Sequence, residues 1–515
     1  MSLSSVPLPI FVVIPLVAAF ALPVFGRKFK SAATLFANLV TIFILACSIA
    51  VMAAGRSDVY QVGRWSIPLG INLVLDGLSS LLLLVISVVS AAAMLFSTRY
   101  MERYTAKSKY LSLFMLMVAG MNGVVLSGDI FNLFVFLEIT SLASYALVAF
   151  GCEHEELEAA FKYMVLGSIA STLVLFGIAL VYGNTGTLNM AYMSQFIAQN
   201  GLNKGLSFAL VLFITGFGLK AALVPFHAWL PDAHPSAPAP ISAMLSGVII
   251  KALGIYALAR VVFNIFGITT EVAWVLLILG ILSMVMGAFL AIGQWDLKRL
   301  MAYSSISQVG YCVLGIGLGG LLIATGGDIK WAALAILGGL FHLANHAVYK
   351  SLLFLTSGSI EMSTGTRDMN LLGGLAERMP VTRAAATIAS ASIAGVPPFS
   401  GFWSKLLLVI AAVGAHYYWI AAIIVFVSLC TLIMYLKVQR YVFLGELPDN
   451  LSQTSEQKGT MLIAMGFLAC LCVLMGLLLI PSLRVHILEP AVKVLTDGVA
   501  YSANVFDMIK ESGSI

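Results

Sequence analysis

The sequence predicts an all-α protein that crosses a membrane many times, and three observations support this fold class. The 515-residue chain is 60% hydrophobic and only 10% charged, whereas soluble domains carry roughly 25% charged residues. Its apolar residues form about fourteen runs of roughly 18 residues or more, the length that a helix needs to cross a bilayer. The connections between these runs are too short to form a soluble domain.

The apolar runs define the expected helices in chain order. They lie near residues 8–25, 31–53, 72–96, 110–127, 129–150, 161–183, 207–233, 240–264, 272–292, 299–323, 331–360, 382–415, 417–443 and 460–481. The seventh and twelfth runs are expected to be broken helices, because an internal proline removes a backbone donor and crowds the preceding turn. The tail after Pro481 mixes apolar and charged residues, which favours an amphipathic helix along the membrane surface.

Lysine and arginine are distributed unequally between the two sides of these helices. The loops after the first, third, ninth, eleventh and thirteenth runs carry most of them, including Arg99, Arg103 and Arg378. Cytoplasmic loops carry such an excess of basic residues. We therefore expect a multi-pass protein of the cell (inner or plasma) membrane with both termini on the non-cytoplasmic side.

The stretch 219–251 brings several chemistry-bearing residues together around the first break. Lys220 and Lys251 lie inside apolar runs, and between them lie five prolines and the polar side chains of His227, Asp232 and His234. A broken helix inside a membrane occurs only where the freed backbone faces protein or a water-filled cavity. A lysine just before such a break is a candidate for an ion pathway. The alternative is an ordinary proline-rich loop whose lysines extend to a surface.

Glu138 lies about nine residues into its run, which places it roughly 14 Å along the helix and near mid-membrane. A charged, unpaired carboxylate there costs about 2.5–3.5 kcal/mol. It should therefore pair with a cation, for which Lys220 is the natural candidate. Alternatively, a protonated Glu138 bonds to a backbone carbonyl.

His342, His346 and Lys350 are spaced by four residues in the eleventh run, so they lie on one face of the expected helix. A metal site is disfavoured because no acid shares that face and Lys350 would repel a cation. Histidines held by hydrogen bonds in the core are one alternative. A proton relay explains better why imidazoles and an amine line up in an apolar helix, since imidazole both accepts and donates protons near neutral pH.

Lys405 follows the second break, which reads VPPFSGFW over 396–403 and resembles VPFHAW over 224–229. This echo suggests two related units, since broken helices in corresponding halves are typical of transporters built from repeats. Chance recurrence of Pro-Phe is the alternative. Of the remaining charges, Lys162 is expected to face headgroups or to pair with Glu158. Lys298, at a helix start, is expected to be a cytoplasmic anchor.

Five stretches of the chain resemble the antiporter-like subunits shared by respiratory complex I, membrane-bound hydrogenases and Mrp-type Na⁺/H⁺ antiporters. They read FLEITSLASYALVAF, LKAALVPFHAWLPDAHPSAPAPISAMLSG, DLKRLMAYSSISQVGY, HAVYKSLLFLTSGSI and GVPPFSGFWSKLLL. The resemblance implies fourteen helices with two inverted five-helix repeats, in which helices 7 and 12 are broken. The expected units are residues 1–109 (helices 1–3), 110–264 (first repeat), 272–443 (second repeat) and 444–515 (helix 14 and tail). The absence of a long lateral C-terminal helix favours the shorter type, similar to the Mrp D subunit and its hydrogenase relatives.

The resemblance also implies a horizontal row of charged residues at mid-membrane, here called the buried row. Its expected members are Glu138, Lys220, Lys251, His342, His346, Lys350 and Lys405. His227, Asp232, His234 and Lys162 are expected to support it.

We therefore expect a proton-translocating, antiporter-like subunit of a larger energy-converting complex. A change in the Glu138–Lys220 pairing would alter the proton affinity of Lys220 and pass a proton towards Lys251, the eleventh helix and Lys405. A Na⁺/H⁺ exchange subunit of an Mrp-type complex is the alternative. The expected partners are other membrane subunits, the bilayer, H⁺ and, in the alternative, Na⁺, with no nucleic acid.

Two further functions are disfavoured by the sequence. A redox subunit would need a cysteine cluster, haem-spaced histidines or a nucleotide loop, and the six cysteines show no metal-binding spacing. A scaffold without conduction would have no reason to hold charges at mid-membrane. The chain itself is expected to hold no cofactor and no metal and to perform no redox chemistry, even where its parent complex is an oxidoreductase.

Overall fold

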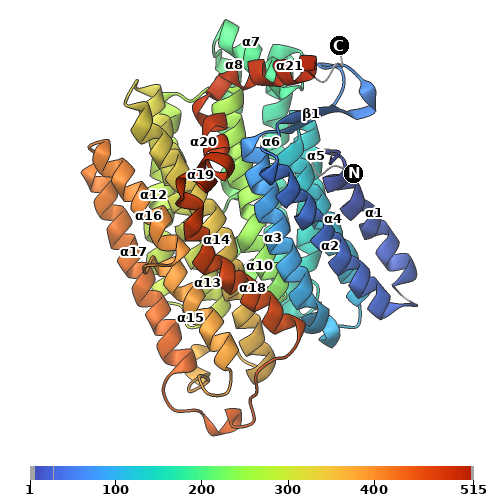
Figure 1. Ribbon diagram of the computed structural model, residues 1–515, viewed down its shortest axis with the longest axis vertical. Helices are drawn as coiled ribbons and strands as arrows, with labels where there is room; N and C mark the ends of the chain where they lie inside the picture. Colours follow the sequence, from blue (N-terminus) through green and yellow to red (C-terminus); the bar gives the residue numbers. More distant parts are fainter. Residues whose placement is uncertain (1–5, 27, 512–515) are drawn as a thin grey trace.

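Long, roughly parallel helices form the body of the computed structural model, which describes residues 6–26 and 28–511 (Figure 1). Within these residues, 11 helices are long and apolar enough to cross a membrane, and two shorter apolar helices lie at Ile10–Phe25 and Ser400–Gly414. The all-α class is confirmed, whereas the number of fourteen crossings stays a prediction. Residues 1–5 and 512–515, at the two ends of the expected outer units, lie outside the described residues.

The first part of the chain forms eight helices and one small sheet. The helices are α1 (Ile10–Phe25), α2 (Lys30–Ala53), α3 (Gly77–Tyr100), α4 (Lys107–Leu126), α5 (Ile130–Val148), α6 (His154–Thr185), α7 (Met190–Asn200) and α8 (Lys204–Lys220). The expected start of a helix at residue 72 is wrong. Strand β2 (Asn72–Leu75) instead pairs with β1 (Asp58–Gln61) in an antiparallel hairpin. Asp76 then begins α3, because its carboxylate accepts a hydrogen bond from the Ser79 amide at 2.9 Å.

The seventh helix breaks where its prolines predict. α8 ends at Lys220, residues 221–229 are irregular, and α9 (Leu230–Ser236) follows. α10 (Ala239–Met244) then continues into a π-helix over Leu245–Tyr256, the short α11 (Ala257–Ala259) and a second π-helical segment over Arg260–Ile265. The whole stretch from Ala239 to Ile265 is buried inside the bundle.

The second part of the chain repeats the pattern of long helices with one break. It contains α12 (Thr270–Ile292), α13 (Leu297–Ala324), α14 (Ile329–Thr364), α15 (Pro380–Ala394), α16 (Ser400–Gly414), α17 (Tyr418–Val438), α18 (Thr460–Leu474), α19 (Pro481–Ile487), α20 (Glu489–Thr496) and α21 (Tyr501–Glu511). The break between α15 and α16 covers 395–399. Glycine lets α12 and α13 pack closely, since a Cβ at Gly310 would lie 2.5 Å from the Met284 backbone nitrogen.

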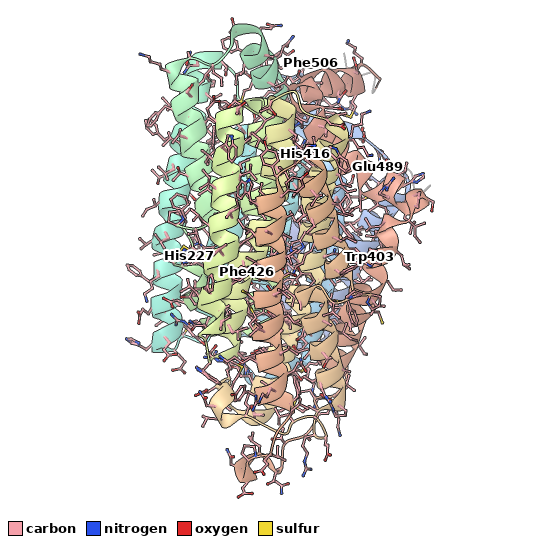
Figure 2. The ribbon with its side chains drawn as sticks, turned by 90° about the vertical axis from the view of Figure 1, so that its left-hand side faces the viewer. His227, Trp403, His416, Phe426, Glu489 and Phe506 are labelled. Atoms are coloured by element: carbon pink, nitrogen blue, oxygen red, sulfur yellow. The ribbon has the colours of Figure 1, made fainter. Side chains whose placement is uncertain are left out.

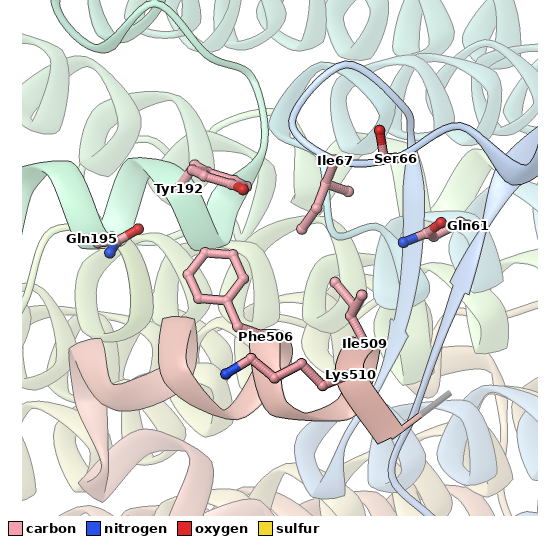
Figure 3. Close-up of a pocket in the computed structure, with 8 residues that line it drawn as sticks. All are labelled: Gln61, Ser66, Ile67, Tyr192, Gln195, Phe506, Ile509 and Lys510. Atoms are coloured by element: carbon pink, nitrogen blue, oxygen red, sulfur yellow. The ribbon is translucent and has the colours of Figure 1, made fainter. Parts of the chain in front are cut away.

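A layer of short elements covers one end of the bundle. α7, α21 and the β1–β2 hairpin lie together there, and the polypeptide begins and ends towards the same end (Figure 1). The Tyr192 and Phe506 rings make a T-shaped contact at 4.9 Å. These elements border an open cavity of about 430 Å³ whose lining includes Gln61, Gln195 and Lys510 (Figure 3). The tail therefore packs on the protein through α20 and α21.

A buried ion pair links helices at this end of the bundle. The Arg260 guanidinium donates to both carboxylate oxygens of Asp76, at 2.7 and 2.9 Å, and so joins the π-helical segment to the start of α3. Asn264, one turn further along, donates to the carbonyls of Val494 and Gly498 at 2.7 and 3.0 Å. The helical stretch that carries Lys251 is thus tied both to the start of α3 and to the C-terminal segment.

We expect Asp76→Asn to lower the free energy of unfolding by about 3–5 kcal/mol, because it leaves a buried guanidinium without its counter-charge. The measurement is thermal unfolding of the purified protein by tryptophan fluorescence. Asp507→Asn is the matched control, since that carboxylate is 68% exposed in its pair with Lys510 and exposed pairs contribute only about 0–1 kcal/mol. Equal unfolding midpoints for the two variants would contradict a stabilising role of the Asp76–Arg260 pair.

Candidate ion pathway

Glu138 and Lys220 lie together at the first helix break, as the sequence predicts. Lys220 is the last residue of α8 and is 5% exposed. Its Nζ lies 3.8 Å from Glu138 Oε1 and donates to Ser141 Oγ at 2.9 Å. Glu138 also accepts a hydrogen bond from Ser171 of α6. The Glu138 side chain keeps 31% of its surface exposed on the outside of the single chain.

Side chains satisfy the backbone that the break sets free. The Trp229 indole donates to the Leu219 carbonyl at 3.0 Å and stacks on Tyr163 at a centroid distance of 4.2 Å. The Val224 amide donates to Ser283 Oγ of α12 at 3.0 Å. An interrupted helix inside a membrane requires this kind of compensation by neighbouring protein. The break is therefore stabilised by these contacts, and it fixes the position of Lys220 at the end of α8.

Lys251 lies in the π-helix next to the break and is fully buried. Its Nζ donates to the carbonyl of Ser246, five residues earlier. The π-helix packs tightly on α8, because a Cβ at Gly254 would lie 2.5 Å from the Cα of Ala221. It also packs on α14, because a Cβ at Gly247 would lie 2.3 Å from Ser351 Oγ. Lys251 thus lies between the two helices that carry Lys220 and Lys350.

α14 carries His342, His346 and Lys350, all fully buried. His342 Nδ1 lies 2.9 Å from Ser404 Oγ of α16, and its Nε2 lies 3.2 Å from Gln308 Oε1 of α13. Both ring nitrogens of His346 have no hydrogen-bond partner among the described residues. The interpretation of satisfied core histidines therefore fits His342 but not His346.

Lys350 and Lys405 are held by hydroxyl and carbonyl oxygens. Lys350 Nζ donates to Ser304 of α13 and to the Tyr435 hydroxyl at 3.1 Å. Lys405, 5% exposed on α16, donates to the Ile393 carbonyl at 2.8 Å. It further donates to the Ala394 carbonyl at 3.3 Å and to Ser428 Oγ at 3.0 Å.

An aromatic ring joins Lys405 to the histidines. Lys405 Nζ lies 5.1 Å from the centroid of Tyr311, whose ring is 5.0 Å from that of His342. His227 and Trp403 mark the surroundings of the two breaks and lie at similar heights in the bundle (Figure 2). Both breaks therefore place a buried lysine next to a helix end.

Of the expected supporting residues, only His234 lies deep in the bundle. It is fully buried, and its ring stacks on Phe354 of α14 at 4.5 Å. Lys162, whose side chain is 46% exposed, pairs with Glu158 at 2.8 Å and with Asp232 at 3.1 Å. His227 is half-buried in the break. Lys162 and Asp232 thus form an ion-pair network in which exposed side chains take part.

The expectation that Lys298 is a surface anchor is wrong. Lys298 is 1% exposed, and its Nζ lies 3.0 Å from Glu361 Oε2, near the end of α14. The local sequence, DLKR, does read as a helix start, and Asp296 does accept a hydrogen bond from the Arg299 amide at 2.8 Å. Burial of Lys298 depends on its partner 63 residues away, which no local signal reveals.

Metal ligands do not gather in the described part of the chain. No group of three or more His, Cys, Asp or Glu side chains within residues 6–26 and 28–511 could hold a metal ion. The His342 and His346 ring centroids lie 6.5 Å apart, and the oxygens bonded to His342 come from the neutral side chains of Ser404 and Gln308. The chemistry that these groups can perform is the transfer of protons between amines, imidazoles and a carboxylate.

Comparison with known families and proteins gives consistent results. Residues 127–431 match the family model described as NADH:quinone oxidoreductase/Mrp antiporter, transmembrane. Residues 61–111 match the model for the N-terminus of complex I chain 5. The chain is 36% identical to the N subunit of the NADH-quinone oxidoreductase of Desulforudis audaxviator, over 79% of this chain and 82% of that protein. It is 35% identical to the D subunit of the Na⁺/H⁺ antiporter of Alkalihalophilus pseudofirmus, over 85% of this chain and 89% of that protein.

Solved structures agree with the sequence matches. A chain of the Mrp complex from a Dietzia species superposes with a TM-score of 0.87 at 30% identity and covers 98% of this chain and 100% of its own length. A chain of the archaeal membrane-bound sulfane sulfur reductase, a respiratory membrane complex, superposes with a TM-score of 0.85 at 32% identity, over 97% and 99% of the two chains. Both relatives belong to assemblies of several membrane subunits.

The unequal partners of the two histidines lead to a stability prediction. His342→Leu should lower the free energy of unfolding by about 1–2 kcal/mol, because it removes the buried hydrogen bonds of the imidazole with Ser404 Oγ and Gln308 Oε1. His346→Leu should change it by less than about 0.5 kcal/mol, because no hydrogen bond to another described side chain is lost. Thermal unfolding of both variants measures the difference. Equal destabilisation by the two substitutions would mean that His346 also has a structural partner.

Proposed function

Because the chain belongs to the NADH:quinone oxidoreductase/Mrp antiporter transmembrane family, we propose that it moves protons through the buried row. It is an antiporter-like, multi-pass subunit of an energy-converting membrane complex. The observation that supports the proton pathway most strongly is the placement of Lys220 beside Glu138 at the end of a broken helix. The remaining members of the row would continue the path through the π-helix, α14 and α16.

The first step of the proposed mechanism is a change in the Glu138–Lys220 distance. At an effective dielectric constant near 20, two unit charges about 7 Å apart interact by roughly 2–3 kcal/mol. A change of that size alters the proton affinity of a neighbour by nearly a hundredfold. When Glu138 moves away or becomes protonated, Lys220 releases its proton. Lys251 takes up this proton, and its new positive charge alters the proton affinity of the next residue in the row.

The second half of the path uses imidazole as the carrier. Proton transfer from Lys251 would reach His346, whose ring nitrogens have no hydrogen-bond partner among the described residues. His342 and Lys350 flank His346 on the same face of α14. Lys405 would then release the proton at the second break. We propose no catalytic, cofactor or metal role for any of these residues.

Exchange of Na⁺ for H⁺ is the second candidate function. It is favoured by 35% identity to a protein named as the D subunit of a Na⁺/H⁺ antiporter, over 89% of that protein. The same fold and row would serve both ions. Flux measured with and without Na⁺ on the opposite side of the membrane separates the two candidates.

We propose a location in the cell membrane with both termini on the non-cytoplasmic side. The short elements near the termini lie at one end (Figure 1), and basic residues such as Arg99, in the last turn of α3, and Arg103, just after it, lie at the other. We also propose the division into units 1–109, 110–264, 272–443 and 444–515. The paired breaks at 221–229 and 395–399 support two repeats within it.

We expect Glu138→Gln to reduce proton flux at least tenfold in vesicles containing the assembled complex. The neutral amide carries no negative charge, so it cannot raise and lower the proton affinity of Lys220 as the carboxylate does. The control is Glu158→Gln, which removes an exposed carboxylate from the pair with Lys162 and should leave flux unchanged. Native gel electrophoresis checks assembly. Wild-type flux in Glu138→Gln would rule out the proposed first step.

We expect Lys405→Ala and Lys405→Arg both to block net translocation, because the row loses the amine that releases the proton. Arginine keeps a hydrogen-bonding cation at this position but does not give up its proton. Lys437→Ala is the matched control, since Lys437 also donates to two carbonyls, of Ile292 and Gln294. Normal flux in Lys405→Arg would show that Lys405 keeps its proton throughout the cycle.

A further inference from the structure

A polar cavity opens at the end of the bundle opposite the termini. It has a volume of about 420 Å³ and lies where α3 ends, α6 begins and α9 meets α10. Charged groups reach it from the residues after α3, from the start of α6, from α13 and α14 and from the loop after α14, whereas the turn between α9 and α10 contributes uncharged residues. The lining includes Arg103, Glu156, Ser236, Lys298, Glu361 and Arg367. None of these residues belongs to the buried row.

The inner wall of this cavity is the ion pair between Lys298 and Glu361. Lys298 comes from α13 and Glu361 from the last turns of α14, and their side chains are 2% and 19% exposed. Arg367 Nη1 lies 3.7 Å from the other carboxylate oxygen of Glu361. Removing such charges from water is costly and contributes little net stability. A buried pair that borders a polar cavity is therefore a candidate for a function in ion transfer.

A hydrogen-bonded turn connects the ion pair to His234. Lys298 Nζ donates to the Ala237 carbonyl at 3.1 Å. Ser242 Oγ lies 3.4 Å from that same carbonyl and donates to the His234 carbonyl at 2.8 Å. The residues of this turn, from Pro235 to Pro238, also line the cavity. Only one short turn thus lies between the cavity and a fully buried imidazole.

His234 in turn lies next to the buried row. Its ring stacks on Phe354 at 4.5 Å, and the Phe354 centroid is 5.8 Å from Lys350 Nζ. Both ring nitrogens of His234 have no hydrogen-bond partner within the described part of the chain. An imidazole in this state can accept a proton at one nitrogen and donate one from the other.

We propose that this cavity is a proton inlet, in which Glu361 takes up a proton beside Lys298 and His234 passes it to Lys350. The proposal rests on the proposed function, since the proton ends in the same row. Glu361 accepts a proton from water in the cavity, which breaks its ion pair. It then gives that proton, through a bridging water, to one nitrogen of His234. The imidazolium donates its other N–H proton to the neutral Lys350 amine, which passes it on along the buried row. Glu361, again a carboxylate, re-forms its pair with Lys298, and a shift of the remaining proton between the two ring nitrogens restores the first tautomer of His234.

The first experiment compares carboxyl variants at one position in the assembled complex. Glu361→Gln should reduce proton flux into vesicles at least tenfold, whereas Glu361→Asp should keep at least half of it because a carboxyl group remains. Glu377→Gln is the matched control, since Glu377 is exposed at the same end of the bundle. Unequal flux in assembled Gln and Asp variants is a result that a merely structural role would not give. Wild-type flux in Glu361→Gln would overturn the proposal.

The second experiment tests access from one side of the membrane. In a background without the exposed Cys152 and Cys470, Ser236→Cys should react with a charged thiol reagent, and the reaction should block flux. The control is Ser57→Cys, which lines a cavity of about 310 Å³ between α3, α20 and α21. Modification at Ser236→Cys without loss of flux would overturn the inlet.

One further variant separates failure of the inlet from failure of the proposed function. Glu138→Gln is measured in the same vesicles. If it abolishes flux while Glu361→Gln does not, the buried row conducts and the inlet is wrong. If neither variant changes flux, the proton pathway itself is wrong.

Discussion

Amines inside an apolar bundle need oxygen atoms around them, and this need shapes the middle of the protein. Lys220, Lys251, Lys350 and Lys405 are at most 5% exposed. Among the described residues, Glu138 is the one carboxylate that comes within 4 Å of any of them. An unpaired charge at mid-membrane is costly. Lys251, Lys350 and Lys405 must therefore rely on dipoles, and each donates to hydroxyl or carbonyl oxygens.

Irregular helices supply many of these oxygens. In a regular α-helix, the interior carbonyls accept hydrogen bonds from amides four residues later, and only the last turn leaves them free. The break after α15 provides such an end, so Lys405 can donate to Ile393 and Ala394. The π-helix shifts the register of its hydrogen bonds, and Lys251 donates to Ser246 within it. The interrupted helices therefore supply carbonyl oxygens at the places where the buried lysines need them.

Sequence reasoning succeeded where a local rule is strict and failed where burial depends on distant partners. Proline at 225 requires a break, and a carboxylate at 138 inside an apolar run requires a cation, so both features follow from the residues themselves. Asp76 and Arg260 are separated by 184 positions, and Lys298 and Glu361 by 63. In the sequence, each of these four residues looks like an ordinary charged residue at the end of a helix. Strand β2 was not predicted because its four residues are continuous in sequence with the apolar run that forms α3.

The π-helix over Leu245–Tyr256 has a mechanical consequence for Lys251. Arg260, four residues beyond its far end, is held by the ion pair with Asp76, so a change of winding within the segment would act on the residues before that anchor, Lys251 among them. A shift of one residue between π and α winding turns a side chain by about 100° around the helix axis. Such a turn would move the Lys251 amine around the helix axis while the two ends of the segment stay in place. The winding of this segment therefore sets the direction in which Lys251 points.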